Sequence, residues 1–174
     1  TIFILLIGQR KKLMADVCYL WKHKRQFFSL MAAAFFISIN WYIYIWAVTH
    51  DRVLESSMGY YINPIISVVF GMIFFKEKLS RPTIVALFIA LLGVLVMTIN
   101  YGQVPWASLL LALSFAIYGV LKKRIVLDAT RGLAIETLFI LPLALMYYVY
   151  LYMNHSMQFL HEGWQTDVLM MISG

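Results

Sequence analysis

Five long apolar runs, separated by short polar loops, constrain the fold of this chain more than any other feature. They cover residues 27–49, 54–75, 82–99, 104–121 and 133–153. A helix needs about 20 mostly apolar residues to cross the hydrocarbon core of a bilayer, so the third and fourth runs lie near the lower limit. Because no run alternates between polar and apolar residues along its length, β-barrel strands fit poorly. The pattern predicts an all-α, polytopic membrane helical bundle.

The basic residues between these runs predict the orientation of the bundle. The sequence contains fourteen lysine and arginine residues, and thirteen of them fall on alternate loops. Arg52 is the exception and lies between the first and second runs. Loops that are rich in Lys and Arg are retained in the cytoplasm. We therefore expect the loops before residue 27, between 75 and 82, and between 121 and 133 to be cytoplasmic.

Composition excludes several classes of protein. Apolar residues make up 63% of the chain and charged residues 13%, whereas soluble domains contain about 45–50% and 25%. The net charge of +6 comes from the loops just described, so the lipid bilayer is an expected partner and nucleic acid is not. Cys18 stands alone and forms neither an internal disulfide nor a cysteine metal site. No motif for catalysis, phosphate binding or metal binding is present, so we expect no catalytic residue, metal or cofactor, and no enzyme.

Both ends of the chain are apolar and predict further spans. Residues 1–8 and 168–174 are expected to be the end of one span and the start of another, which makes the chain a fragment of a longer protein. Residues 9–26 form a predicted cytoplasmic loop. Within it, Leu13–Trp21 has apolar residues at helical spacing among lysines, and could form an interfacial helix or an ordinary solvated linker. Ser80, Arg81 and Pro82 predict a helix start.

The second full run carries a polar and small stripe on one helical face. The spacing of four, three, four and four residues places these positions together; they are Ser56, Tyr60, Asn63, Ser67 and Gly71. Pro64 cannot donate a hydrogen bond and clashes with the carbonyl group of Tyr60. A freed carbonyl inside a bilayer must face protein, water or ligand. The stripe therefore predicts a substrate-lining or gating helix, and the alternative is a kinked helix that packs against a neighbour.

Asn40 and Tyr44 share one face of the first full run. Asn40 either bonds to another helix or lines the same cavity as Asn63, and both interpretations stay open. Asparagine together with aromatic side chains suits a planar or amphipathic organic solute better than a bare metal ion.

Glu136 is the acidic residue that lies clearly inside a predicted span. It is either paired with Arg131 or the 122–124 basic cluster, or it serves as a proton-coupling or substrate-binding carboxylate. Small residues at four-residue spacing predict close helix contacts. They occur at Ser108, Ala112 and Ala116, at Ser67 and Gly71, and at Ala86, Ala90 and Gly93.

Several segments carry a resemblance to a known family. They are Asn40–Val48, Arg52–Ser57, Gly59–Pro64, Phe75–Ser80, Pro105–Trp106, Leu113–Phe115 and Leu133–Leu143. These segments resemble the RarD-like permeases of the EamA group in the drug/metabolite transporter superfamily, and the likeness covers nearly the whole chain. The asparagine–tryptophan and tyrosine–isoleucine–asparagine–proline segments are specific to this branch, whereas the Lys76–Lys78 turn is shared by the wider superfamily.

The resemblance implies a ten-span protein of the bacterial inner membrane, built from two five-helix inverted repeats. On that pattern residues 1–100 end the first repeat and residues 101–174 begin the second. It also implies a secondary transporter, exporting small organic solutes or drugs by alternating access. The family is associated with chloramphenicol, but that does not fix a natural substrate.

The alternative is a membrane structural or assembly subunit that transports nothing. A homo-oligomer is compatible with either. The residues expected along the solute path are Asn40, Tyr44, Tyr60, Asn63, Pro64, Ser67 and Glu136.

Overall fold

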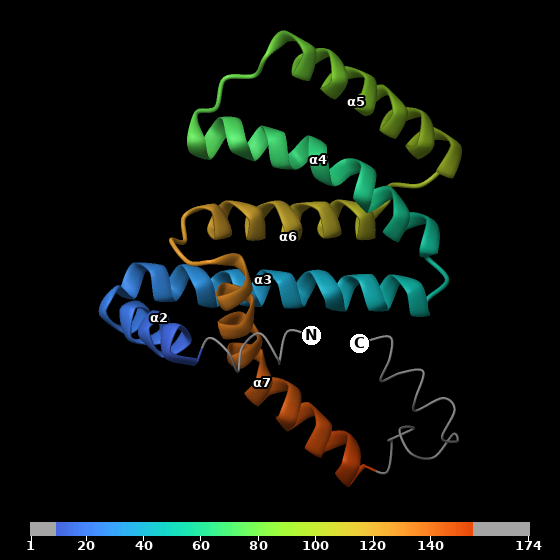
Figure 1. Cartoon of the computed structure of the whole chain (residues 1–174). Coiled ribbons are helices and arrows are strands. Elements are labelled where there is room, and N and C mark those ends of the chain that lie inside the picture. Colours follow the sequence, from blue (N-terminus) through green and yellow to red (C-terminus); the bar gives the residue numbers. More distant parts are fainter. Residues whose placement is uncertain (1–9, 155–174) are drawn as a thin grey trace. The chain divides into compact units, whose positions relative to one another are not determined.

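The computed structural model describes residues 10–154, which form six helices and, within that range, no strand. The helices are α2 (Arg10–Lys22), α3 (Lys24–Thr49), α4 (Val53–Phe75), α5 (Arg81–Tyr101), α6 (Trp106–Lys123) and α7 (Ala129–Met153) (Figure 1). Five of them, α3 to α7, are long and apolar enough to cross a membrane. Each matches one predicted run, with ends that differ by at most four residues. The predicted helical membrane bundle is confirmed.

Local sequence signals explain where α5 begins and ends. The side chain of Ser80 caps the helix and accepts a hydrogen bond from the Thr83 backbone N–H at 3.4 Å, and Pro82 lies in the first turn. This confirms the predicted helix start. Gly102 ends the helix with φ of 74°, in the left-handed region that glycine adopts without a steric penalty.

The helix α6 lies two residues further along the chain than predicted. Pro105 precedes it at the N-cap position and provides no side-chain cap. Lys122 and Lys123 belong to the last turn instead of the loop, because basic side chains interact favourably with the negative end of the helix dipole.

The predicted loop 9–26 is largely helical. It contains α2 and the start of α3, with His23 between them. The His23 ring nitrogen Nδ1 lies 2.9 Å from the carbonyl oxygen of Tyr19, so the side chain supports the end of α2. Residues 13–21, for which we considered an interfacial helix or a solvated linker, are therefore helical. The predicted partial spans 1–8 and 168–174 lie outside the described residues.

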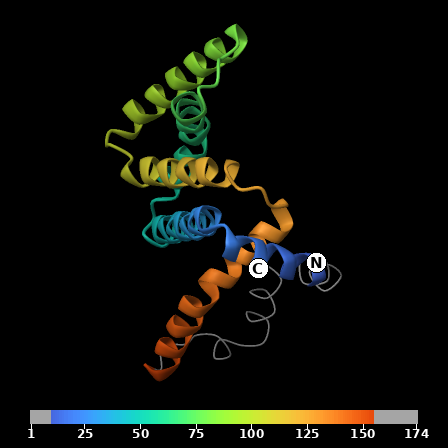
Figure 2. The same cartoon turned by 90° about the vertical axis from the view of Figure 1, so that its left-hand side faces the viewer.

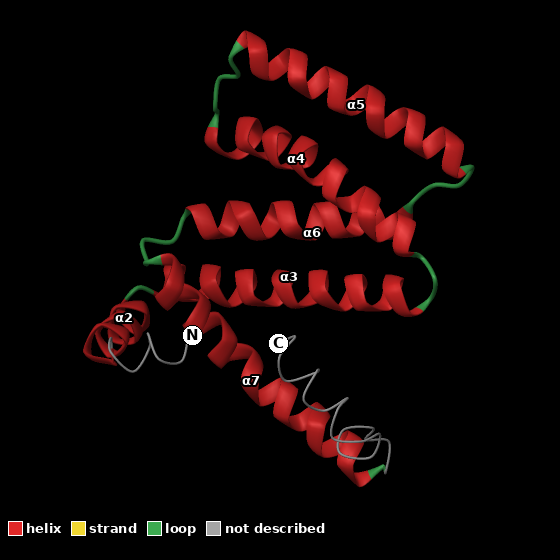
Figure 3. Ribbon diagram, turned by 45° about the vertical axis from the view of Figure 1, so that its right-hand side comes forward, coloured by secondary structure: helices red, strands yellow, loops and turns green. Residues whose placement is uncertain are grey.

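The chain divides into two compact units, residues 1–137 and 138–174, and the division falls inside α7. In the first unit α6 packs between α3 and α4, while α5 packs against α4 (Figures 1 and 3). The helix α4 runs parallel to α6 and α3 runs antiparallel to it. The described part of the second unit is residues 138–154, which complete α7, with Pro142 inside the helix.

Small residues form the contact surface of α6. Ser108, Ala112 and Ala116 are almost completely buried, which confirms their predicted packing role. On the facing helix, a Cβ atom at Gly59 would lie 3.2 Å from the Cβ of Leu111, so glycine permits the close approach of α4 and α6.

The similar line of small residues on α5 does not pack in this way. Ala86, Ala90 and Gly93 are all exposed among the described residues. A Cβ atom at Gly93 would meet nothing within 4 Å. Among the described residues this line therefore makes no close helix contact, and the predicted contact stays a prediction.

Candidate functional site

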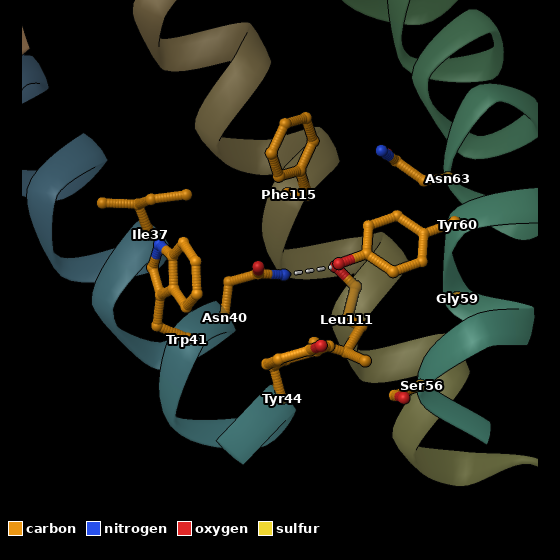
Figure 4. A pocket seen from close by; sticks show the side chains of 10 residues that line it. All are labelled: Ile37, Asn40, Trp41, Tyr44, Ser56, Gly59, Tyr60, Asn63, Leu111 and Phe115. Carbon is orange, nitrogen blue, oxygen red and sulfur yellow. Dashed lines mark hydrogen bonds between the residues drawn. The ribbon is translucent and has the colours of Figure 1, made fainter. Parts of the chain in front are cut away.

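A cavity of about 300 Å³ lies between α3, α4 and α6. Figure 4 shows side chains from all three helices extending toward it. The lining residues are Ile37, Asn40, Trp41 and Tyr44 from α3, Ser56, Gly59, Tyr60 and Asn63 from α4, and Leu111 and Phe115 from α6. The described part of the chain thus supplies amide, hydroxyl, aromatic and aliphatic groups to the cavity and no charged side chain. The cavity is therefore suited to binding an organic molecule through stacking and hydrogen bonds.

Asn40 connects α3 to α6 at the wall of this cavity. Its Nδ2 donates to the carbonyl oxygen of Leu111 at 2.8 Å and to the Ser114 hydroxyl oxygen at 2.9 Å (Figure 4 shows the first bond). The Ser114 hydroxyl also donates to the Leu111 carbonyl at 3.0 Å. Both sequence-based interpretations of Asn40 thus apply together, because it bonds to a neighbouring helix and borders the cavity.

Asn63 presents an amide group to the cavity from α4. Its Oδ1 accepts a hydrogen bond from Ser67, one turn further along the same helix, at 3.1 Å. The other end of the amide has no hydrogen bond to any residue within 10–154. In Figure 4 the Asn63 side chain extends from α4 toward α6. Unlike Asn40, whose amide nitrogen is tied to α6, Asn63 has one end of its amide available to a ligand.

Two tyrosines complete the polar part of the lining. Tyr44 from α3 and Tyr60 from α4 border the cavity, and Tyr60 is 67% exposed. Stacking on an aromatic face and hydrogen bonding to a phenol are the contacts that such side chains offer a ligand. The structure thus brings together four of the residues predicted to line the solute path. Asn40 and Tyr44 come from α3, and Tyr60 and Asn63 come from α4.

Pro64 and Ser67, also expected on the solute path, do not border the cavity. The helix α4 is continuous from Val53 to Phe75 with Pro64 inside it, and the proline is exposed. The Ser67 hydroxyl donates a hydrogen bond to Asn63, which borders the cavity, so Ser67 helps to position the Asn63 side chain. A role in gating stays a prediction for Pro64.

Glu136 lies apart from the cavity and has close partners. Its carboxylate pairs with Lys122, and the hydroxyl of Tyr118 donates to it at 3.4 Å. Glu136 is 1% exposed. Arg131 pairs instead with Asp16 at 2.6 Å. The structure therefore places Glu136 with the 122–124 cluster, and a coupling role stays a prediction.

Glu55 is a buried carboxylate that the sequence analysis did not identify. It is 1% exposed although it lies in the first turn of α4. Its Oε1 accepts from Tyr101 at 2.8 Å and pairs with Arg52 at 3.1 Å, and its Oε2 accepts from the Ala107 backbone N–H at 3.0 Å. A carboxylate at a helix N-terminus satisfies a free N–H group and interacts favourably with the helix dipole.

The sequence signals that α6 lacks a local cap, although it does not identify Glu55 as the residue that supplies one. The helix α6 begins after Pro105, where the Ser, Thr, Asp or Asn that usually caps a helix is missing. Its first N–H groups are therefore free to bond to an acceptor from elsewhere. Glu55 supplies it and at the same time binds the last residue of α5, Tyr101. It joins three helices at one end of the bundle, opposite the end where Lys123 pairs with Glu77.

Comparison with known proteins identifies relatives over most of the chain. The model of the EamA-like transporter family matches residues 1–99. An uncharacterized transporter of Bacillus subtilis, YojE, is 47% identical over 84% of this chain and 48% of its own length. Protein RarD of Escherichia coli is 38% identical over 77% of the chain and 48% of its own length. No solved structure matches the chain.

A further relative carries a more specific name. The chloramphenicol-sensitive protein RarD of Pseudomonas aeruginosa is 34% identical over 83% of this chain and 49% of its own length. The chain thus spans about half the length of the curated relatives it matches.

Proposed function

Because this chain belongs to the EamA-like transporter family, we propose that the full-length protein is a secondary transporter of small organic solutes. The family and the five span-length helices make it a multi-pass protein of the bacterial inner membrane. We further propose that the whole protein carries out this transport, that its solutes are small organic molecules, and that it exports them. It also assigns the cavity between α3, α4 and α6 to the solute path.

The observation that carries the proposal is the convergence of Asn40, Tyr44, Tyr60 and Asn63 on one cavity inside a membrane bundle. Polar side chains within spans are rare unless they bond to another helix or line a pathway. Asn40 has a bond to a neighbouring helix, but one end of the Asn63 amide has no partner within 10–154. A polar solute in the cavity would supply that partner.

The position of the cavity along the chain supports a mechanism of alternating access. Its walls come from α3 and α4, before residue 101, and from α6, after it. The first repeat is expected to end at residue 100, and the second to begin at residue 101. In transporters built from inverted repeats the substrate site lies at the interface between the repeats, and rocking of one against the other exposes it to alternate sides. A cavity with walls from both repeats would change shape in such a motion.

The lining favours organic solutes over ions. Moving a charge out of water is costly unless an opposite charge meets it, and within residues 10–154 no charged side chain borders the cavity. Trp41, Tyr44 and Phe115 offer aromatic faces. A suitable solute therefore carries an aromatic or other planar group together with hydrogen-bonding atoms.

The test is accumulation of solutes by inverted membrane vesicles that contain the full-length protein. The panel includes chloramphenicol, because one relative is named for sensitivity to it, and aromatic amino acids, each with and without a pH gradient. Asn63→Leu should reduce accumulation about tenfold or more, because a hydrogen bond to the solute would be lost. Accumulation in inverted vesicles would also establish export.

The matched control is Asn100→Leu. Asn100 lies on α5, and its amide donates to the carbonyl oxygen of Val96 on the same helix. This variant makes the same chemical change within a span but outside the cavity, so it should transport as well as the wild type. Equal accumulation by the Asn63→Leu variant at equal abundance would remove Asn63 from the path. Wild-type vesicles that accumulate no solute of the panel would count against these solute classes.

A further inference from the structure

The helix α2 presents three different faces to its surroundings. One face holds it to the bundle: Leu20 is 2% exposed, and Asp16, one turn earlier, pairs with Arg131 at 2.6 Å. A second face is polar or small and exposed, with Lys12 and Ala15. The third face is apolar and largely exposed, although the ring of Trp21 makes an edge contact with the ring of Phe27, with ring centroids 6.2 Å apart.

The apolar face consists of Met14, Val17, Cys18 and Trp21. The spacing of three, four and seven residues from Met14 places all four on one side of the helix. Met14 and Trp21 are each 76% exposed, Val17 is 42% exposed, and Cys18 is exposed. These side chains, with Leu13 and Lys22, also border a hollow of about 370 Å³. We refer to Met14, Val17, Cys18 and Trp21 as the outer face of α2.

The helix α2 lies crosswise to the spans. Figure 2 shows α2 along its length where α3 is seen nearly end-on, and Figure 3 shows α2 nearly end-on where α3 is seen along its length. Both helices belong to the first unit. Because α3 is a span, a helix crosswise to it lies along the plane of the membrane. It is also attached at one end of α3, through His23, which places it at the level of the membrane surface.

Basic residues surround this end of the bundle. Lys22, Lys24 and Arg25 are exposed next to the outer face of α2. The start of α3 also lies beside the end of α6, since the Ser29 hydroxyl donates to the Leu121 carbonyl at 3.3 Å. The last turn of α6 carries Lys122 and Lys123, but these pair with Glu136 and Glu77. The positive charge near the outer face of α2 therefore comes from Lys22, Lys24 and Arg25.

We propose that the outer face of α2 inserts into the headgroup region of the membrane that carries the protein, and that it does so at anionic phospholipids. Amphipathic helices with Trp and Leu on one face and basic residues beside it lie in this layer. Tryptophan is favoured at the interface between lipid and water. Phosphate groups of anionic lipids would complement Lys22, Lys24 and Arg25. The inference does not depend on the proposed transport function.

The test measures the depth of a nitroxide label on the full-length protein in lipid nanodiscs. Cys18 is the one cysteine in these 174 residues, and any others in the full-length protein are replaced by alanine. Two collision rates of the nitroxide label are compared. One is the rate with oxygen, which concentrates in lipid, and the other is the rate with a water-soluble nickel complex. The matched control is Lys12→Cys in a Cys18→Ala chain, which places the label on the polar face of the same helix.

In nanodiscs rich in phosphatidylglycerol the label at Cys18 should collide mainly with oxygen, and the label at position 12 mainly with the nickel complex. In nanodiscs of phosphatidylcholine alone the Cys18 label should shift toward the nickel complex. Equal exposure of both labels to the nickel complex would overturn the proposal. Shielding of Cys18 from both reagents would also overturn it, because a protein surface would then cover the face. An unchanged result in the two lipids would overturn the preference for anionic headgroups.

Discussion

The helices α5 and α6 follow one another in the chain, yet they differ in how far the described residues bury them. The helix α5 is the most apolar of the five described spans and contains no buried residue. The helix α6 is less apolar, carries the buried serines Ser108 and Ser114, and packs between α3 and α4 (Figure 3). In a soluble protein the more apolar helix would be the buried one.

The difference in burial between α5 and α6 follows from the lipid that surrounds a membrane protein. Lipid tails are as apolar as leucine side chains, so burial of apolar surface does not drive two helices together within a bilayer. Close packing of small residues and hydrogen bonds between helices do so instead. Gly59 allows α4 to approach Leu111, and Asn40 bonds α3 to α6. Polarity and small size, more than apolarity, therefore identify the core span.

The largest effect on stability is expected for Glu55→Ala. Glu55 holds the start of α6 and the end of α5, and Ala107 and Tyr101 would both lose their acceptor. The loss of these two hydrogen bonds to a charged acceptor costs about 3 kcal/mol in total. Thermal unfolding of the purified full-length protein in detergent measures this loss.

The control for this prediction is Glu77→Ala at the opposite end of α6. Glu77 pairs with Lys123, but both side chains are about half exposed. Exposed ion pairs contribute about 1 kcal/mol or less. If the two variants unfolded at the same temperature, burial would not distinguish the two ends of α6, and the account of Glu55 would be wrong.

The next largest effect is expected for Gly59→Leu. Glycine has no Cβ atom, and one added at position 59 would lie 3.2 Å from the Cβ of Leu111 and 3.4 Å from the Ser108 carbonyl oxygen. A larger side chain would force α4 and α6 apart, at a cost of about 2 kcal/mol. Gly93→Leu on α5 is the matched control, because a Cβ atom there would meet no side chain or other helix of residues 10–154 within 4 Å. Chemical unfolding of both variants should separate them, and equal destabilisation would place α5 in the core as well.

A smaller effect is expected for Asn40→Leu. The variant removes two hydrogen bonds from α3 to α6, and contacts of this kind within membranes contribute about 1 kcal/mol. Asn100→Leu should change stability little, because its amide bonds within α5. Unfolding curves for the two variants check the difference. A larger loss from Asn100→Leu would contradict the assignment of α6 as the core span.

The sequence predicts the spans well, because span length and apolar composition are properties of a single segment. The ends depend on local chemistry, and there the agreement is weaker. The helix α6 begins after Pro105 and extends through Lys123, two residues beyond the apolar run. The start of α5 was predictable, since Ser80 and Pro82 are signals read at the helix end itself.

The candidate site was predictable only in part. Spacing within α4 correctly placed Ser56, Tyr60 and Asn63 on one face, and all three border the cavity. Spacing in one helix carries no information about its neighbour, so the bond from Asn40 to Leu111 could not be foreseen.

Two further differences have the same origin. Glu55 resembles an ordinary loop charge until the N-terminus of α6 is placed against it. The line of Ala86, Ala90 and Gly93 has the spacing of a packing face, but a small residue is equally compatible with contact to lipid. Both depend on which helices meet, a property of the whole bundle that no single segment contains.

The central claim is that solute passes through the cavity between α3, α4 and α6, and two adjacent tyrosines test it most directly. Tyr60 and Tyr61 are 67% and 60% exposed, and of the two Tyr60 borders the cavity. The measurement compares kcat/KM of the full-length Tyr60→Ala and Tyr61→Ala variants for a solute that wild-type vesicles accumulate. The account predicts a loss of about tenfold for Tyr60→Ala, equivalent to about 1.4 kcal/mol, and an unchanged value for Tyr61→Ala. Equal values for the two variants would contradict it.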